Sequence, residues 1–137
     1  MPYKGSEMKI SGKFEVDLKP LEFSAQGVNE INLGRMSIDK TFHGDLQARS
    51  KGEMLNAITS AKGSAGYVAI EQVVGTLSGK EGSFVLQHFG TMKQGSNRLV
   101  LEVVPDSGSE ELAGLSGEMK INIENNQHYY EFNYQFA

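Results

Sequence analysis

The chain has 137 residues, of which 39% are hydrophobic and 22% charged, as in one globular domain with a substantial core. Its formal net charge is −4 and its 13 lysines and arginines are scattered. This argues against a nucleic-acid partner, because a phosphate backbone requires concentrated positive charge. The absence of cysteine excludes disulfides, thiolate metal sites and a cysteine nucleophile. We expect a single domain over residues 1–137, with its ordered core at 8–136.

The first ten residues, MPYKGSEMKI, contain no apolar segment like that of a signal peptide. No apolar run approaches the length of a membrane-spanning helix. We therefore expect a cytoplasmic protein that contacts neither a membrane nor a nucleic acid. No motif points to a cofactor, so none is expected.

Alternating apolar and polar residues, the pattern of half-buried strands, run through most of the chain. In the first half they predict strands at residues 8–18, 33–49 and 54–59. The first strand should end at Pro20, because proline cannot donate to a β-ladder, and Val16 and Leu18 should face a core. The second keeps its parity across His43 and Gly44, which favours one long strand bent at the glycine over two strands joined by a turn.

In the second half the same pattern predicts two hairpins, 66–76 with 83–91 and 117–124 with 127–136, and a strand at 98–104 between them. In the last hairpin, Asn125 and Asn126 tolerate the positive φ of a type I′ loop. Counting outward from this loop pairs the following residues: Ile123 with His128, Ile121 with Tyr130, Met119 with Phe132, and Lys120 with Glu131.

Polar segments rich in glycine and serine mark the turns between the strands. They are expected at residues 50–53, 61–64, 78–81, 94–97 and 106–109. The last of these precedes a single helical turn predicted at 110–115, with Ser107 or Ser109 as its N-cap. Backbone donors there could bind an anion, although capping is the commoner role of such residues.

About eight strands with short connections and one helical turn indicate an all-β protein. Consecutive hairpins favour an antiparallel meander. Closure into a single antiparallel β-barrel is preferred over a sandwich, because closure removes both exposed edges and a glycine-bent strand suits strong curvature.

Four segments carry a family resemblance, and they are KTFHGDLQA (40–48), GYVAIEQVVGTLSGKEGSFVLQHFG (66–90), VVPDSGSEELAGLSG (103–117) and HYYEFNY (128–134). They resemble an uncharacterised bacterial family known as a domain of unknown function. The resemblance implies a barrel similar to that of plant allene oxide cyclase, also described as calycin-like. Related cyclase and dirigent barrels handle hydrophobic or phenolic molecules in their interiors. No cyclase catalytic motif maps onto residues of this chain, so its catalytic residues stay unknown.

Glu71 and His88 are the leading candidates for a site. A loop centred on Gly79 and Lys80 would set them directly opposite each other, with Tyr67 on the same face. Such a carboxylate–imidazole pair can act as a general base or anchor a ligand. Two alternatives give the pair no function. Glu71 and His88 could form a structural pair inside the sheet, or both could lie on the solvent face, since the residues of the opposite parity are also apolar.

The last strand carries an aromatic stripe of Tyr130, Phe132, Tyr134 and Phe136. Such a stripe usually belongs to a core, but in a wide barrel it could line a ligand cavity. His43 and His128 complete the three histidines, and without an HxH or HExxH spacing no metal site is expected.

Three functions follow as hypotheses. The first is binding of a small apolar or aromatic molecule inside the barrel, with Glu71, His88, Tyr67, Tyr130 and Tyr134 as ligand contacts. The second is an isomerase or cyclase that uses Glu71 and His88 as acid and base. The third is a packed barrel that forms a homo-oligomer through its outer face.

Overall fold

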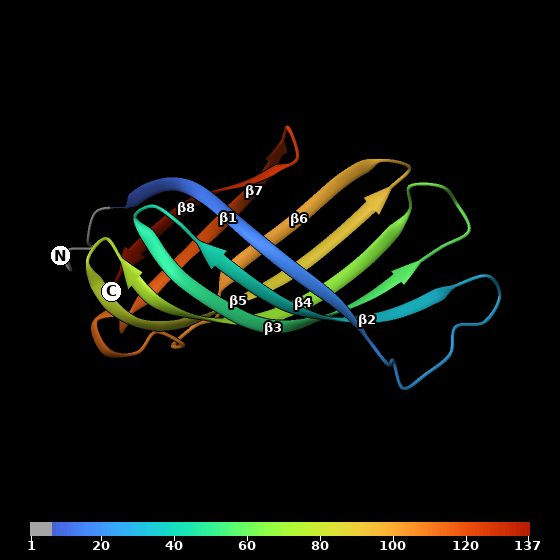
Figure 1. Ribbon diagram of the computed structural model, residues 1–137, viewed down its shortest axis with the longest axis horizontal. Helices are drawn as coiled ribbons and strands as arrows, with labels where there is room; N and C mark the ends of the chain where they lie inside the picture. Colours follow the sequence, from blue (N-terminus) through green and yellow to red (C-terminus); the bar gives the residue numbers. More distant parts are fainter. Residues whose placement is uncertain (1–6) are drawn as a thin grey trace.

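Eight antiparallel strands close into a barrel in the computed structural model, which describes residues 7–137 (Figure 1). Neighbouring strands in the barrel are neighbours in the sequence, and β1 pairs with β8 to close it. The strands are β1 (Met8–Leu21), β2 (Asn32–Phe42), β3 (Leu46–Ile58), β4 (Ala65–Leu77), β5 (Lys80–Lys93), β6 (Ser96–Val103), β7 (Leu115–Glu124) and β8 (Gln127–Phe136). Of the first ten residues, which lack the apolar segment of a signal peptide, residues 1–6 lie outside the described part of the chain.

The predicted all-β barrel is therefore confirmed. The described chain adds one 3-10 turn, η1 (Glu110–Leu112), and no helix in it is long and apolar enough to cross a membrane. The helical turn expected at 110–115 is shorter than predicted. Ser109 stands at its N-cap position but does not cap it. The Ser109 hydroxyl instead accepts a hydrogen bond from the backbone N–H of Ser83 at 3.0 Å and lies 2.7 Å from the Ser83 hydroxyl.

The barrel has a filled end and an open end. The β2–β3 and β4–β5 turns and the β6–β7 connection lie at the filled end, on the left of Figure 1. At the other end, inward-facing side chains stay accessible to solvent: Ile58 is 50% exposed, Leu99 41% and Ile123 62%. Apolar side chains at inward positions are normally buried, so their exposure shows that the interior opens to solvent at this end.

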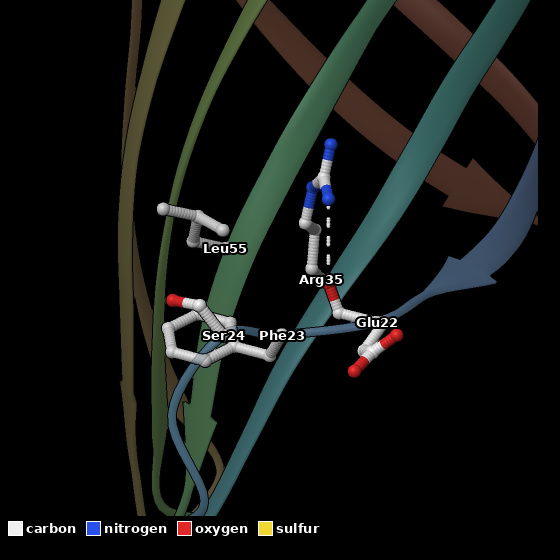
Figure 2. Close-up of a pocket in the computed structure, with 5 residues that line it drawn as sticks. All are labelled: Glu22, Phe23, Ser24, Arg35 and Leu55. Carbon is white, nitrogen blue, oxygen red and sulfur yellow. Dashed lines mark hydrogen bonds between the residues drawn. The ribbon is translucent and has the colours of Figure 1, made fainter.

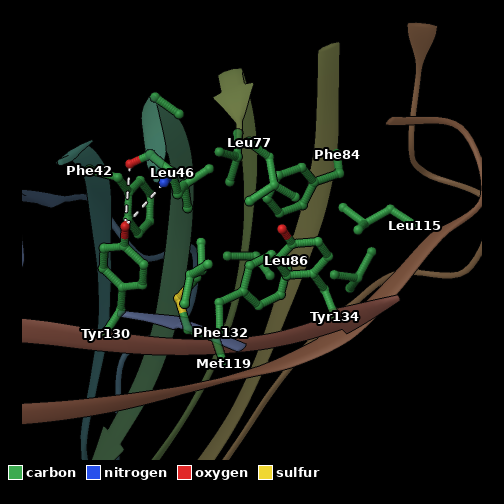
Figure 3. Packing of buried hydrophobic residues seen from close by; sticks show 14 of the residues in the cluster. Phe42, Leu46, Leu77, Phe84, Leu86, Leu115, Met119, Tyr130, Phe132 and Tyr134 are labelled. Atoms are coloured by element: carbon green, nitrogen blue, oxygen red, sulfur yellow. Dashed lines mark hydrogen bonds between the residues drawn. The ribbon is translucent and has the colours of Figure 1, made fainter. Parts of the chain in front are cut away.

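A hydrophobic core fills the interior towards the filled end, as Figure 3 shows. Its largest side chains are almost completely inaccessible, among them Phe42, Phe84 and Phe132. The rings of Phe84 and Phe132 stack with centroids 5.8 Å apart. Each such ring contributes about 1.5–3 kcal/mol through its buried apolar surface. Alternation along each strand, apolar inward and polar outward, places these residues in the core.

The β4–β5 hairpin forms as predicted, but its register differs by two residues. Ser78 and Gly79, with φ of 47° and 83°, are the two loop residues, and Lys80 already pairs with Leu77. Positive φ at both positions defines the type I′ loop that matches the strand twist. Glu71 therefore lies opposite Leu86, and His88 lies opposite Ala69. A shift of two keeps the parity, so Glu71 and His88 still share one face.

The single bent strand predicted at 33–49 is wrong, because the chain turns at 43–45 into two strands. Gly44 has φ of 106°, a conformation that favours glycine. The Tyr130 hydroxyl holds this turn by donating to the His43 carbonyl at 2.8 Å and accepting from the Leu46 N–H at 3.3 Å. The parity persists across the turn, which explains why the two strands resemble one.

Two further boundaries differ from the prediction. The turn expected at 50–53 lies inside β3, where Gly52 pairs with Ile38 on one side and with Glu71 on the other. β1 continues through Pro20. The proline is tolerated because β8 pairs with Met8 to Phe14, so the later residues of β1 pair with β2 on one side and have no partner strand on the other. Leu18 lies in this extension and is 39% exposed, so it does not join the core as expected.

The β7–β8 hairpin has the predicted loop and register, and β7 begins at Leu115 rather than at the predicted residue 117. Asn125 and Asn126 have φ of 50° and 62°, as a type I′ loop requires. The predicted pairs of Met119 with Phe132 and of Lys120 with Glu131 are present. The first pair is buried in the core.

Candidate functional site

Four polar side chains meet inside the barrel between the core and the open end. Lys40, Ser50, Glu71 and His88 come from β2, β3, β4 and β5, and none is more than 5% exposed. We call them the buried polar cluster. Lys40 Nζ donates to Glu71 Oε2 at 2.8 Å, and His88 Nε2 lies 2.5 Å from the same oxygen. Ser50 Oγ donates to Glu71 Oε1 at 2.6 Å.

The cluster holds Glu71 as an anion. Burial alone would raise the pKa of this carboxyl, but hydrogen bonds from His88, Lys40 and Ser50 and the Lys40 charge outweigh it and lower the pKa to about 2. The ammonium of Lys40 also lies 5.1 Å from the ring centroid of Phe14, a cation–π contact. Within residues 7–137, no buried side-chain nitrogen or oxygen is left without a hydrogen-bond partner.

Tyr67 extends the cluster towards the open end. Its hydroxyl lies 3.1 Å from Nδ1 of His88, so one imidazole bridges Tyr67 and Glu71. Burial, followed by the Glu71 charge, raises the pKa of Tyr67 to about 12, so the phenol keeps its proton at neutral pH. The Tyr67 ring lies over Gly90 on β5, where an added Cβ would be 2.4 Å from Tyr67 Cε1.

A cavity of about 370 Å³ lies at the open end, on the inner face of β3 to β6. We call it the mouth cavity. Its lining combines apolar side chains with neutral polar ones and one arginine. The inward-facing residues of the lining are Met54, Asn56, Ile58, Ala65, Tyr67, Gly90, Met92, Asn97 and Leu99. Tyr67 is the residue that belongs both to this lining and to the hydrogen-bond chain of the buried polar cluster.

The structure brings together three of the five residues expected at a site. Glu71, His88 and Tyr67 form one connected chain and face the interior. Tyr130 and Tyr134 lie apart from the mouth cavity, in the hydrophobic core. Tyr130 holds the β2–β3 turn, and the Tyr134 hydroxyl lies 3.0 Å from that of Ser78 at the filled end.

Lys40 and Ser50 are cluster members that sequence reasoning missed. Lys40 shares the inward parity of Ile38 and Phe42. A lysine at an inward position between apolar residues is the sequence signal that indicates a buried ion pair. The segment of Ser50 to Glu53 predicts a turn, which conceals the position of Ser50 in a strand. Its inward position becomes evident once β3 is recognised as one continuous strand.

A second hollow, of about 500 Å³, lies on the outer face beside the connection that follows β1 (Figure 2). Its lining includes Phe23, Arg35 and Leu55. Arg35 Nε donates to Glu53 Oε1 at 2.7 Å, and Arg35 Nη1 donates to the Glu22 carbonyl at 3.3 Å. The charge of Arg35 is therefore already paired, which makes this hollow a weaker candidate than the mouth cavity despite its size.

The other two histidines lie outside the cluster. His43 Nε2 contacts the Glu15 carboxylate at 2.9 Å on the surface, and the His128 ring lies 5.2 Å from that of Phe14. Among residues 7–137, no three His, Cys, Asp or Glu side chains gather as a metal site would require.

Comparison with known proteins places the chain in a family. A search of curated proteins finds no match. The model of a family described as Protein of unknown function (DUF3224) matches residues 10–134. Among solved structures, the chain is similar to a DUF3224 protein of unknown function from Shewanella oneidensis MR-1. The two share 62% sequence identity and a TM-score of 0.94, over 96% of this chain and 99% of that chain. The expected relation to an uncharacterised bacterial family is confirmed, and this chain belongs to the DUF3224 family.

Proposed function

We propose that the barrel binds a small, partly apolar molecule in the mouth cavity. The observation that carries the proposal is that Tyr67 lines the cavity while its hydroxyl is held by His88, which is held in turn by Glu71. A buried chain of this kind fixes the orientation of a polar contact before a ligand arrives, which lowers the entropic cost of binding.

The composition of the lining supports this class of ligand. Met54, Met92 and Leu99 offer adaptable apolar contacts, and Asn56 and Asn97 offer amide groups. A mostly apolar cavity with a few convergent polar groups is the usual form of a small-molecule site. The resemblance to allene oxide cyclase barrels, whose relatives handle hydrophobic molecules in their interiors, favours an interior site by analogy of fold. The proposal keeps the cytoplasmic location expected from the sequence.

Glu71 and His88 act in this proposal as positioning residues rather than as acid and base. Glu71 accepts hydrogen bonds from three side chains and does not line the mouth cavity. An acid or base that works near neutral pH needs a pKa near that pH, whereas the pKa of Glu71 is about 2. The isomerase or cyclase hypothesis is therefore less well supported than binding.

Two naphthalene probes test the proposal by their fluorescence, 2-naphthol and its methyl ether, 2-methoxynaphthalene. The matched variants are Leu99→Trp, which fills the mouth cavity, and Val100→Trp, which adds the same bulk on the outer face of the same strand. We expect saturable binding to the parent and to Val100→Trp, and its loss in Leu99→Trp. Equal binding by both variants would place the probes elsewhere and contradict the proposal.

Native mass spectrometry of the protein purified gently from its host provides a second test. A small-molecule adduct that disappears in the denatured spectrum supports the proposal. A ligand-free mass, together with no saturable binding of either naphthalene probe, would contradict it.

A further inference from the structure

The direction of the hydrogen bonds behind Tyr67 follows from the buried polar cluster. Glu71 is ionised, and a carboxylate can only accept hydrogen bonds. Nε2 of His88 lies 2.5 Å from Glu71 Oε2, so this nitrogen carries a proton and donates it. One end of the chain is therefore fixed by the carboxylate.

The charge balance of the cluster determines whether Nδ1 of His88, its second ring nitrogen, donates or accepts a hydrogen bond. Glu71 carries one negative charge and already pairs with Lys40 at 2.8 Å. Two groups on β4 face His88, Tyr67 and Glu71, and Leu101 on β6 lies directly opposite it. Lys40 on β2 interacts with His88 through the Glu71 carboxylate that both contact. A second cation beside Lys40 would leave a buried net charge, which is strongly unfavourable. With Nε2 donating to Glu71, this balance leaves Nδ1 of His88 as an acceptor.

A phenol has one proton to donate, and the Tyr67 hydroxyl uses it on Nδ1 of His88, 3.1 Å away. Within residues 7–137, the Tyr67 hydroxyl makes no second hydrogen bond. The oxygen keeps its lone pairs, and Tyr67 lines the mouth cavity. The group it offers a ligand is thus an acceptor.

We propose that the mouth cavity selects molecules that carry a hydroxyl or N–H donor, with the Tyr67 oxygen as the acceptor that recognises it. This inference rests on the proposed function, because it assigns the ligand class of the same cavity. The amides of Asn56 and Asn97 contain both donors and acceptors, so they do not impose this preference.

The same two probes test the preference. 2-Naphthol has a hydroxyl donor and 2-methoxynaphthalene lacks it, while the aromatic body is shared. The ratio of the two probes' dissociation constants is measured in the parent and again in Tyr67→Phe. Comparing these two ratios removes the effect of the extra methyl group of the ether. We expect the preference for 2-naphthol to fall about tenfold in Tyr67→Phe, as for one lost hydrogen bond, with little change for the ether.

The outcomes separate the two proposals. If neither probe binds the mouth cavity and native mass spectrometry finds no adduct, the proposed function fails. If both bind and Tyr67→Phe leaves their ratio unchanged, binding stands but donor selection is wrong. If Tyr67→Phe weakens the ether more than 2-naphthol, Tyr67 donates to the ligand, which overturns the inferred direction.

A spectroscopic measurement tests the direction without a ligand or a variant. The ¹⁵N chemical shifts of His88 distinguish a protonated Nε2 with a bare Nδ1 from the other tautomer and from imidazolium. We expect the first pattern at neutral pH. A proton on Nδ1 would contradict the inference.

Discussion

Tyr67 and Gly90 lie directly opposite each other on β4 and β5, and the tyrosine ring fills the space that a side chain at position 90 would occupy. A Cβ at Gly90 would be 2.4 Å from Cε1 and 2.9 Å from Cδ1 of Tyr67. The glycine therefore allows the ring to lie across the sheet and its hydroxyl to reach His88. An aromatic side chain covering a cross-strand glycine is a recurrent way to stabilise a β-sheet.

Gly90→Ala should displace the Tyr67 ring and break its hydrogen bond to His88. Gly66→Ala is the matched control, because Gly66 also lines the mouth cavity and its added Cβ would meet nothing closer than the Gly90 carbonyl at 3.8 Å. We expect Gly90→Ala to cost about 1–3 kcal/mol of unfolding free energy and to weaken 2-naphthol binding, and Gly66→Ala to change both much less. Urea unfolding and probe titration measure the two effects. Equal behaviour of the two variants would show that the ring does not depend on Gly90.

The two other inward-facing tyrosines also pair with a glycine on a neighbouring strand. Tyr130 pairs with Gly12 across β8 and β1, and Tyr134 pairs with Gly117 across β8 and β7. A Cβ at Gly12 would be 2.5 Å from the Tyr130 hydroxyl. A Cβ at Gly117 would instead meet the Asn133 carbonyl oxygen at 2.3 Å and Tyr134 Cα at 2.9 Å, so Gly12 makes room for the phenol ring of its partner tyrosine but Gly117 does not.

Tyr130→Phe should destabilise the barrel more than Tyr134→Phe. Removing the Tyr130 hydroxyl takes a partner from the carbonyl of His43 and from the N–H of Leu46, and Leu46 is 1% exposed. An unsatisfied buried backbone group costs about 1–3 kcal/mol. The partner of Tyr134 is Ser78, an exposed loop residue that water can reach. Chemical unfolding of both variants checks the order, and a larger loss for Tyr134→Phe would refute it.

Much of the barrel could be predicted from local patterns. The alternation of apolar and polar residues locates the strands, and the Asn125–Asn126 loop fixes the β7–β8 register. Boundaries failed where a tertiary contact decides them. Tyr130 holds the turn at 43–45 from a distant strand, and Gly52 stays inside β3 because both neighbouring strands pair with it. Neither effect is visible in the local sequence.

The candidate site was only partly predictable for a similar reason. Glu71 and His88 lie within one hairpin, so their shared face follows from parity even when the register is off by two. Lys40 reaches Glu71 from β2, two strands away in the barrel. Its role depends on the order in which the strands pair, which the alternation pattern does not encode.

Glu71 and Lys40 should show strong coupling in a double-mutant cycle. Glu71→Gln leaves a buried ammonium without its counter-ion, and Lys40→Met leaves the carboxylate without its cation. We expect each single variant to lose about 3–5 kcal/mol of unfolding free energy. The double variant removes both charges and keeps an amide that can contact Ser50 and His88, so it should lose less than either single variant. Additive losses would show that the two charges do not depend on each other.

Acid should destabilise this protein partly through Glu71. Its pKa is lowered from the ordinary value of 4.5 to about 2 in the folded state, so the unfolded chain binds the proton more tightly. The stabilisation is therefore fully present above pH 4.5 and is lost as the pH falls from 4.5 to about 2. The shift of the Glu71 pKa corresponds to about 3 kcal/mol of unfolding free energy.

Other carboxylates titrate in the same range, so the control is the Lys40→Met/Glu71→Gln double variant, which retains them. We expect the unfolding free energy of the parent to fall more steeply with acid than that of the double variant. Parallel curves over this range would show that Glu71 is not held as a stabilised anion in the barrel.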